Sequence, residues 1–297
     1  MAKAEKVRLL VGTRKGGYIA ESDVKRKRWT VQGPFHAGRD VYHVAADPRH
    51  PGDLYAAVNS PFFGPILVRS ANWGKTWKEI APPMMPVSSE RPPPDPSATQ
   101  PARPIVNLWH IEPGHASEPD TIFLGIDPAS LFRSDDRGGS WAPVPGLNEH
   151  PTRDKWNPGA GGMCLHTILI DPSRPKRMYV GISAAGTFRS DDAGEHWRPV
   201  NKGVLVSFLP TKKIEVGQCV HHVVADPVDH DTFYRQDHDG IHVSHDAMDS
   251  WKRVGKSLKS DFGFVVGAAP ALPGQAFFVP LFGESRTTFD GGMQVYR

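Results

Sequence analysis

The apolar residues of this chain lie in short runs, separated by segments rich in Gly, Pro, Asp and Ser. Several pairs of runs are joined by an Asp-Pro dipeptide. Because proline cannot donate to a sheet ladder, each dipeptide predicts a turn between two strands. The clearest pairs are 41–46 with 54–58 around Asp47-Pro48, 166–170 with 178–182 around Asp171-Pro172, and 220–225 with 232–234 around Asp226-Pro227. No segment has the 3.6-residue periodicity of an amphipathic helix, so the pattern predicts an all-β fold.

A second pattern, Ser-x-Asp/Asn-x-Gly-x-x-Trp, follows the third strand of four predicted units. The Asp or Asn side chain can accept hydrogen bonds from backbone amides ahead of it, and glycine supplies a positive φ. The tryptophan begins the next strand and is expected to pack beneath the turn. The four segments are 70–77, 134–141, 190–197 and 244–251, the last with Met248 in place of glycine. Their tryptophans recur at intervals of 64, 56 and 54 residues, which indicates an array of repeated units.

Each unit therefore has four antiparallel strands, which is typical of a blade of a β-propeller. We expect a single domain, 1–297, whose one Pro-rich inter-blade loop is 81–107. The six blades are predicted at about 7–32, 41–80, 108–144, 164–200, 219–254 and 262–297. The first blade lacks an opening strand and the last lacks its closing strand, so both are predicted to be incomplete. Such open terminal blades would allow self-association through an unpaired edge.

Composition narrows the classes of partner. The chain has 297 residues, of which 39% are hydrophobic and 23% charged, enough to bury a core. Its net charge of +3 is small and dispersed, so we expect no nucleic-acid partner. No long apolar run or signal core is present, so the sequence predicts a cytoplasmic protein without membrane attachment. The two cysteines are expected to be free thiols.

The four Ser-to-Trp segments resemble the Asp boxes of bacterial Asp-box (BNR) repeat proteins of the sialidase-like superfamily. The resemblance covers almost the whole chain and is to the branch labelled glycosyl hydrolase or exo-α-sialidase-like. Its less generic stretches are 12–16, 54–60, 147–154, 217–221 and 261–264. It implies a propeller that binds or hydrolyses a carbohydrate, although Asp boxes also occur in propellers without that chemistry.

Two features depart from that family. Sialidases resemble one another in an arginine triad that begins in a Phe/Tyr-Arg-Ile-Pro signature, which is absent here. Only Arg14 lies at a similar early position, so we do not expect a true sialidase. Relatives of this branch also continue beyond the equivalent of Arg297. The sequence leaves open whether the ring closes or the chain is truncated.

The loops that join strands two and three, and those that join successive blades, are long and dissimilar. They should share one side of the propeller, where we expect the site. Acid/base chemistry needs two carboxyl groups across a pocket, and the candidates are Glu112, Glu149, Asp154 and Asp237. Aromatic rings stack on sugars while polar groups bind hydroxyls, and the candidates are Arg14, Asn59, His150, Trp156 and His238. Ordinary loop packing is the alternative for each.

Four histidines occupy the third position of an apolar-x-His motif at the start of an innermost strand: His43, His110, His166 and His221. Such histidines could surround one pocket and bind a ligand or a divalent metal. Alternatively, they pack between blades and bond to the neighbouring backbone. Two Cys-x-His pairs, at Cys164 and Cys219, could also form a Cys₂His₂ zinc site. No phosphate loop or dinucleotide fingerprint implies another cofactor.

Together these features predict a sialidase-like β-propeller that binds a small polar or carbohydrate ligand at the mouth of its channel. Glycoside hydrolysis remains open. The alternative is a non-catalytic scaffold that binds another protein, as many propellers do.

Overall fold

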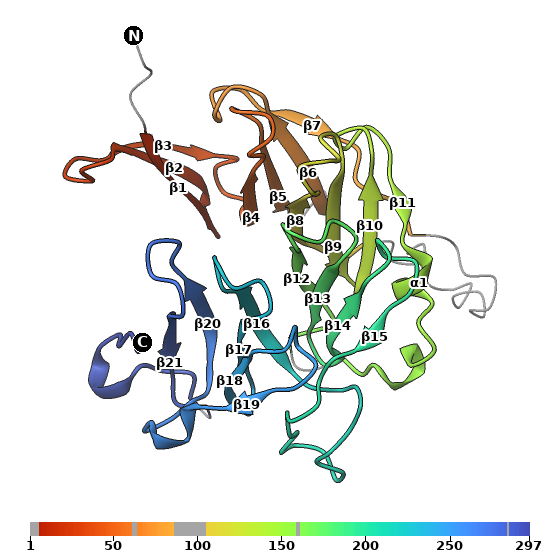
Figure 1. Ribbon diagram of the computed structural model, residues 1–297. Coiled ribbons are helices and arrows are strands. Elements are labelled where there is room, and N and C mark those ends of the chain that lie inside the picture. The colour runs from red at the N-terminus through yellow and green to blue at the C-terminus, as the bar shows by residue number, and fades with distance from the viewer. Residues whose placement is uncertain (1–5, 61–63, 86–104, 159–160, 284) are drawn as a thin grey trace, which may run out of the picture. The chain divides into compact units, whose positions relative to one another are not determined.

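The fold is a β-propeller, as the sequence predicts. The computed structural model describes residues 6–60, 64–85, 105–158, 161–283 and 285–297, so most of the Pro-rich loop 81–107 lies outside the described residues. In the described residues the strands form six antiparallel sheets, the blades. The chain divides into two compact units, Met1–Pro143 and Val144–Arg297, each with three sheets (Figure 1).

The first unit holds one sheet of three strands and two sheets of four. The first sheet has the order β1-β2-β3, with bounds Lys6–Thr13, Gly16–Asp23 and Thr30–Phe35. The second is β4-β5-β6-β7, with bounds Asp40–Ala46, Leu54–Ser60, Gly64–Ser70 and Lys78–Ile80. The third is β8-β9-β10-β11, with bounds Asn107–Pro113, Ile122–Asp127, Ser130–Ser134 and Ala142–Pro143. The opening strands β1, β4 and β8 are neighbours in that order.

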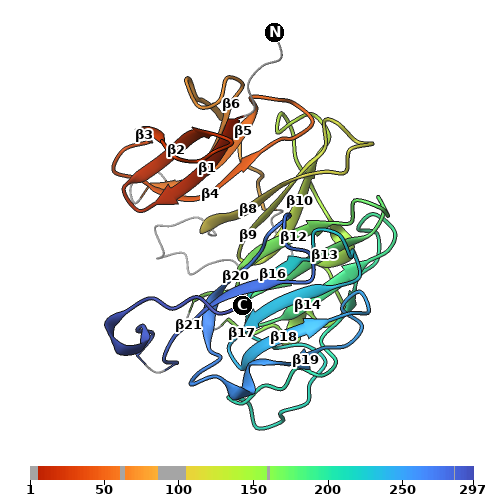
Figure 2. The ribbon, with the colours of Figure 1, turned by 60° about the vertical axis from the view of Figure 1, so that its left-hand side comes forward.

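The second unit holds two sheets of four strands and one of two. The first is β12-β13-β14-β15, with bounds Leu165–Ile170, Met178–Ile182, Gly186–Ser190 and Arg198–Pro199. The second is β16-β17-β18-β19, with bounds Val220–Ala225, Phe233–Asp237, Gly240–Ser244 and Lys252–Arg253. The third is β20-β21, with bounds Gly263–Ala268 and Ala276–Pro280. Strands β12, β16 and β20 lie side by side (Figures 1 and 2).

Both terminal sheets are incomplete, as predicted, but the prediction that the first lacks its opening strand is wrong, because β1 is that strand and neighbours β4. The first lacks a fourth strand, and the last gains only a bridge, in which the backbone groups of Phe278 and Tyr296 bond to each other twice at 2.9 Å. The helices in the described residues are single turns: α1 (Pro145–Asn148), η1 (Arg153–Lys155), η2 (Gly255–Ser257) and η3 (Phe289–Gly291). Among the described residues, no helix is long and apolar enough to span a membrane.

The core lies between neighbouring sheets because both faces of the second and third strands are covered; in β13, for example, every residue is buried. In the first unit, a buried cluster joins Tyr55 and Leu67 of one sheet to Ile111 and Phe132 of the next. In the second unit, residues that include Tyr179, Val223, Phe233 and Trp251 form the equivalent layer. Because neighbouring sheets pack in this way, the ends of their strands, and the loops that join them, are held in place.

The four Ser-to-Trp segments, which we call the box turns, share one hydrogen-bond pattern. The serine hydroxyl donates to the Asp or Asn side chain and accepts the N–H of the fifth residue, and the carboxyl or amide oxygen accepts the N–H of the seventh. All these distances are between 2.8 and 3.0 Å. Two consecutive residues have positive φ, and Met248 adopts 68° where the other three turns use glycine. The sequence predicted the bond from the backbone to the Asp or Asn side chain but neither the two serine bonds nor the second left-handed residue.

Candidate functional site

The second unit contains a pocket of about 440 Å³. It lies among the β13–β14 and β17–β18 turns and the connections between successive sheets, the loops in which the sequence predicted a site. Residues that line it include Lys155, Ser183, Phe208, Cys219, His221, His238, Phe262, Phe264 and Arg286. The pocket therefore combines aromatic rings, imidazoles, a thiol and cations on one set of loops.

Among the lining residues, Cys219 and His221 come from the start of β16, and His238 comes from the β17–β18 turn. His221 Nδ1 lies 2.6 Å from the carbonyl oxygen of Gly263. Since a carbonyl only accepts, Nδ1 carries the proton and Nε2 presents its lone pair. That Nε2 lies 3.5 Å from Cys219 Sγ.

Burial keeps both of these groups neutral. Burial lowers the pKa of His221, while the Gly263 carbonyl and the negative charge of Asp237 act in the opposite direction. Burial likewise raises the pKa of the Cys219 thiol, and Asp237 adds to the effect. At neutral pH the pocket therefore presents a thiol and a neutral imidazole.

Three phenylalanines surround the imidazoles. Phe264 stacks on His221 with ring centroids 4.6 Å apart and planes at 24°. Phe262 lies edge-on to both His221 and His238, at 5.4 and 5.3 Å. Phe208 approaches His238 edge-on at 5.2 Å. The side chain of Phe264 is 40% exposed, so part of its ring surface is free for contact with a ligand.

Cations lie at the mouth of the pocket. Arg286 is exposed, and its guanidinium carbon is 5.8 Å from the centroid of the Phe264 ring. Lys155, at the end of η1, is also exposed. Within the described part of the chain, neither cation forms an ion pair with a carboxylate. Both are therefore available to an anionic group.

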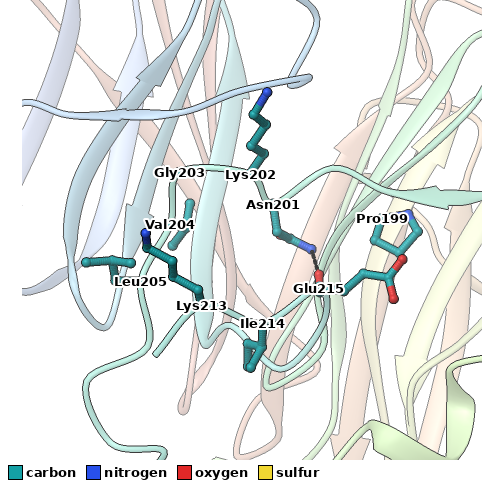
Figure 3. A pocket seen from close by; sticks show the side chains of 9 residues that line it. All are labelled: Pro199, Asn201, Lys202, Gly203, Val204, Leu205, Lys213, Ile214 and Glu215. Carbon is teal, nitrogen blue, oxygen red and sulfur yellow. Dashed lines mark hydrogen bonds between the residues drawn. The ribbon is translucent and has the colours of Figure 1, made fainter. Parts of the chain in front are cut away.

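A second hollow of the same unit has fewer polar groups that could hold a ligand. Its volume is about 540 Å³, and Asn201, Lys202 and Glu215 are among the residues that line it. Asn201 is occupied, because its amide donates to the Glu215 carbonyl at 3.0 Å (Figure 3). The charged ends of Lys202 and Glu215 point away from each other (Figure 3), so this hollow has no converging polar groups.

Two aromatic candidates from the 145–163 loop are structural. His150 is buried, and its Nε2 donates to the Trp197 carbonyl at 3.1 Å. Trp156 is buried as well, and its indole donates to Thr152 Oγ1 at 3.0 Å. Both rings pack on Phe188. The sequence proposed them as ligand contacts, but their burial leaves no surface for a ligand.

The carboxylates proposed in this unit do not meet in the pocket. Asp237 is 1% exposed and forms an ion pair with fully buried Arg235. Glu149 and Asp154 are exposed at the ends of α1 and η1, and neither lines the pocket. None of the described residues that line the pocket is an Asp or Glu.

The four histidines do not occupy equivalent strand positions, so the prediction made from their shared apolar-x-His motif is wrong on this point. Strands β4, β8, β12 and β16 each contain a bulge, located at Tyr42, Trp109, His166 and His221. His43 and His110 lie one residue beyond the bulge, whereas His166 and His221 are the bulged residues themselves. A bulge adds one unpaired residue, and equal spacing in sequence therefore does not give equal placement.

Each of three histidines bonds to the next sheet. His43 Nδ1 accepts the Ile111 N–H at 3.2 Å, His166 Nε2 donates to the Val220 carbonyl at 3.0 Å, and His221 bonds to Gly263 as above. This is the inter-blade packing that the sequence left as the alternative. Of the four, only His221 lines the pocket.

The remaining candidates belong to the first unit. His110 stacks on His43 with centroids 4.4 Å apart, and its Nε2 lies 3.2 Å from Glu112 Oε2. Burial raises the pKa of Glu112 to about 8, against a lowering by Arg49. Asn59 donates to Asn107 Oδ1 at 2.9 Å, and Arg14 is exposed beyond β1.

The residues that the sequence missed are Phe208, Phe262, Phe264 and Arg286. Two of them carried a signal: the 261–264 stretch is one of the specific segments of the family resemblance, and alternate residues of a strand share a face. Phe208 and Arg286 lie in irregular loops, where no periodicity identifies a facing residue.

Comparison with known proteins identifies the fold. No family model matches the chain, and no curated protein matches its sequence. Among solved structures, an ancestral GH74 enzyme is 18% identical over 86% of this chain and 29% of its own, with a TM-score of 0.56. The GH74 xyloglucanase from Xanthomonas campestris is 17% identical over 93% and 49%, with a TM-score of 0.52.

A propeller that is not described as a GH74 enzyme has the same TM-score as the xyloglucanase. The β-propeller domain of Cps50 (Swd1) from Myceliophteria thermophila is 15% identical over 92% of this chain and 76% of its own, with a TM-score of 0.52. The chain spans less than half the length of the two GH74 enzymes. Similarity at this level of identity shows the β-propeller fold and leaves function to be argued from the site.

Proposed function

We propose that the pocket of the second unit binds a small polar ligand of the carbohydrate type that carries an anionic group, such as a sugar acid. The single observation behind this proposal is the meeting of a partly exposed aromatic face with cations that form no ion pair among the described residues: Arg286 lies near Phe264, and Lys155 lines the same pocket. A ring can stack on the apolar face of a sugar, while a guanidinium pairs with a carboxylate.

The proposal is for binding rather than hydrolysis. Glycoside hydrolysis by the usual route needs two carboxyl groups on either side of the bond. The described lining of the pocket has none, and buried Asp237 is held by Arg235. A volume of about 440 Å³ suits a ligand of one or two sugar rings.

A thermal-shift screen against neutral sugars and sugar acids tests the proposal. A ligand at about 100 times its Kd adds about 2.7 kcal/mol to the free energy of unfolding, which gives a clear rise in Tm. We expect sugar acids to raise Tm and the matching neutral sugars to have a smaller effect. If neither class changes Tm, the proposal fails, and the protein-binding scaffold becomes the better hypothesis.

Two variants locate the binding. Arg286→Gln and Phe264→Ala should each weaken sugar-acid binding about tenfold, which corresponds to about 1.4 kcal/mol. Arg26→Gln is the matched control for the first, because Arg26 is also exposed with a φ of 53°, against 54° for Arg286. Leu272→Ala is the control for the second, because Leu272 is also 40% exposed but lies in the β20–β21 turn outside the pocket.

A further inference from the structure

Three side chains with metal-binding atoms converge in the lining of this pocket. The ligand atoms of Cys219, His221 and His238 all lie within 4.8 Å of one another. We propose that these three residues form a zinc site whose fourth coordination position opens into the pocket. The site rests on the protein's own ligands, and it stands whether or not a sugar acid binds.

The distances suit tetrahedral zinc. With Zn–S of about 2.3 Å and Zn–N of about 2.0–2.1 Å, tetrahedral angles separate the sulfur and nitrogen ligands by about 3.6 Å. Cys219 Sγ and His221 Nε2 are 3.5 Å apart. The ligand atom of His238 lies within 4.8 Å of the other two, so a tetrahedral site would require its side chain to move closer to them.

Hydrogen bonds around His221 and Cys219 favour the forms of these side chains that bind a metal. Metal-binding histidines usually donate their other ring N–H to a carbonyl or carboxylate, which fixes the tautomer. His221 does so through Nδ1 to Gly263, which leaves Nε2 facing Cys219. The thiolate form of Cys219 would accept hydrogen bonds from the Ser183 hydroxyl and the Ala184 N–H. Such bonds stabilise a thiolate ligand.

The backbone holds the two parts of the site together. The N–H of His238 donates to the carbonyl of Cys219 at 3.0 Å, which ties the β17–β18 turn to the start of β16. His221 is the bulged residue of β16, and bulges redirect a side chain out of the regular alternation. The ligands are therefore carried by paired strands rather than by free loops.

The donor set indicates the class of metal. One thiolate and two imidazoles suit Zn²⁺ and not Mg²⁺ or Ca²⁺, which prefer oxygen. Three protein ligands with one open position are typical of zinc sites that bind an exogenous group. Arg286 lines the same pocket, where it could pair with an anion bound at the open position.

A rival cluster in the described residues is less suited to zinc. Asp192, Glu195 and His196 are grouped at the surface of a box turn. Asp192 already bonds to the ring and the backbone N–H of His196, at 2.7 and 2.9 Å. Those bonds form the turn, and a metal would have to break them. His196→Gln therefore serves as a control for binding at this surface.

Metal titration of the full chain tests the proposal. After removal of metals with a chelator, we expect one Zn²⁺ per chain, measured by calorimetry and by elemental analysis. Co²⁺, as a spectroscopic probe, should give a thiolate-to-metal charge-transfer absorption. Cys219→Ser should abolish that absorption and weaken Zn²⁺ binding at least tenfold, and His238→Gln should also weaken it. Cys164→Ser, which changes the other thiol, should leave both properties intact.

Each result is decisive when circular dichroism shows the variants to be folded. Absence of stoichiometric Zn²⁺ binding by the wild-type chain would overturn the proposal. So would Zn²⁺ binding that survives Cys219→Ser and His238→Gln but is lost in His196→Gln. Lys155→Gln separates this proposal from the sugar-acid function, because it removes a proposed contact of the anionic group and should weaken the organic ligand while leaving Zn²⁺ affinity unchanged.

Discussion

At the scale of the residue, burial decides the chemistry of each side chain. Glu112 is an example. Its side chain lies beside His110 and keeps about a third of its surface exposed, but the loss of solvent around its carboxyl group still raises the pKa to about 8. Only Arg49 acts against this rise. A neutral carboxyl at this position can donate a hydrogen bond to His110 Nε2.

The raised pKa of Glu112 predicts a pH-dependent stability. In the unfolded chain the carboxyl titrates at its ordinary value of 4.5, and in the folded chain at about 8. The contribution of the protonated group is therefore complete below about pH 4.5 and is lost as the pH rises to about 8. The free energy of unfolding should fall across this window, and Glu112→Gln should reduce the slope.

Denaturant unfolding at several pH values between 4.5 and 8 would measure that slope. Glu149→Gln is the control for the loss of one surface carboxyl group, because Glu149 is exposed and lies in the other unit. An equal slope in Glu112→Gln and the wild type would contradict the account.

The residue scale is also where sequence reasoning was weakest. It recognised the residue types that suit a site. The identity of a residue such as His150, Trp156 or Asp237 does not reveal whether its side chain faces a ligand or the core. Their burial follows from contacts with Trp197, Phe188 and Arg235, which are distant in sequence. No local pattern contains that information.

At the scale of the element, the box turns were predictable because the bonds of their Ser and Asp or Asn side chains are local and lie within eight residues. The N–H of the fourth residue instead donates to a carbonyl well outside the motif, as in Arg137 to Asp120, and no local pattern predicts that bond. The tryptophans differ in burial: Trp251 is 5% exposed, and its indole donates to the Val200 carbonyl at 2.8 Å, whereas Trp141 is only partly buried.

Trp251→Ala should therefore lower the free energy of unfolding by about 3–5 kcal/mol, since it empties a packed site between two sheets. Trp141→Ala should cost less, because part of that ring is already in water. Denaturant midpoints of the two variants give the comparison. If Trp141→Ala proved the more damaging, burial at the box turns would not be the source of their stability.

The prediction that the four histidines occupy equivalent positions was wrong at this scale, and the reason is physical. A bulge inserts one residue without changing the hydrophobic pattern on either side of it. His43 and His221 therefore look equivalent in sequence and occupy different places in their strands. Pairing partners, which belong to the neighbouring strand, were needed to detect the shift.

At the scale of the whole molecule, the sequence predicted the number of blades and the two incomplete terminal sheets. Repetition carried that prediction, because the four complete blades repeat the same box turn. The pocket does not repeat: its residues come from separate connections between Lys155 and Arg286, and each loop has its own length and composition. The sequence could therefore name His221 and His238 among the lining residues but not the loop residues that face them.

The central claim is that this pocket is the functional site, and Cys219 provides a direct probe of it. We would measure alkylation of Cys219 by mass spectrometry with and without the sugar acid that gives the largest rise in Tm. Cys219 is partly buried and lines the pocket, whereas Cys164 is buried and serves as an internal control. The account predicts that bound ligand slows modification of Cys219 while Cys164 stays unreactive. An alkylation rate of Cys219 that is unchanged at saturating ligand would place the ligand elsewhere and contradict the claim.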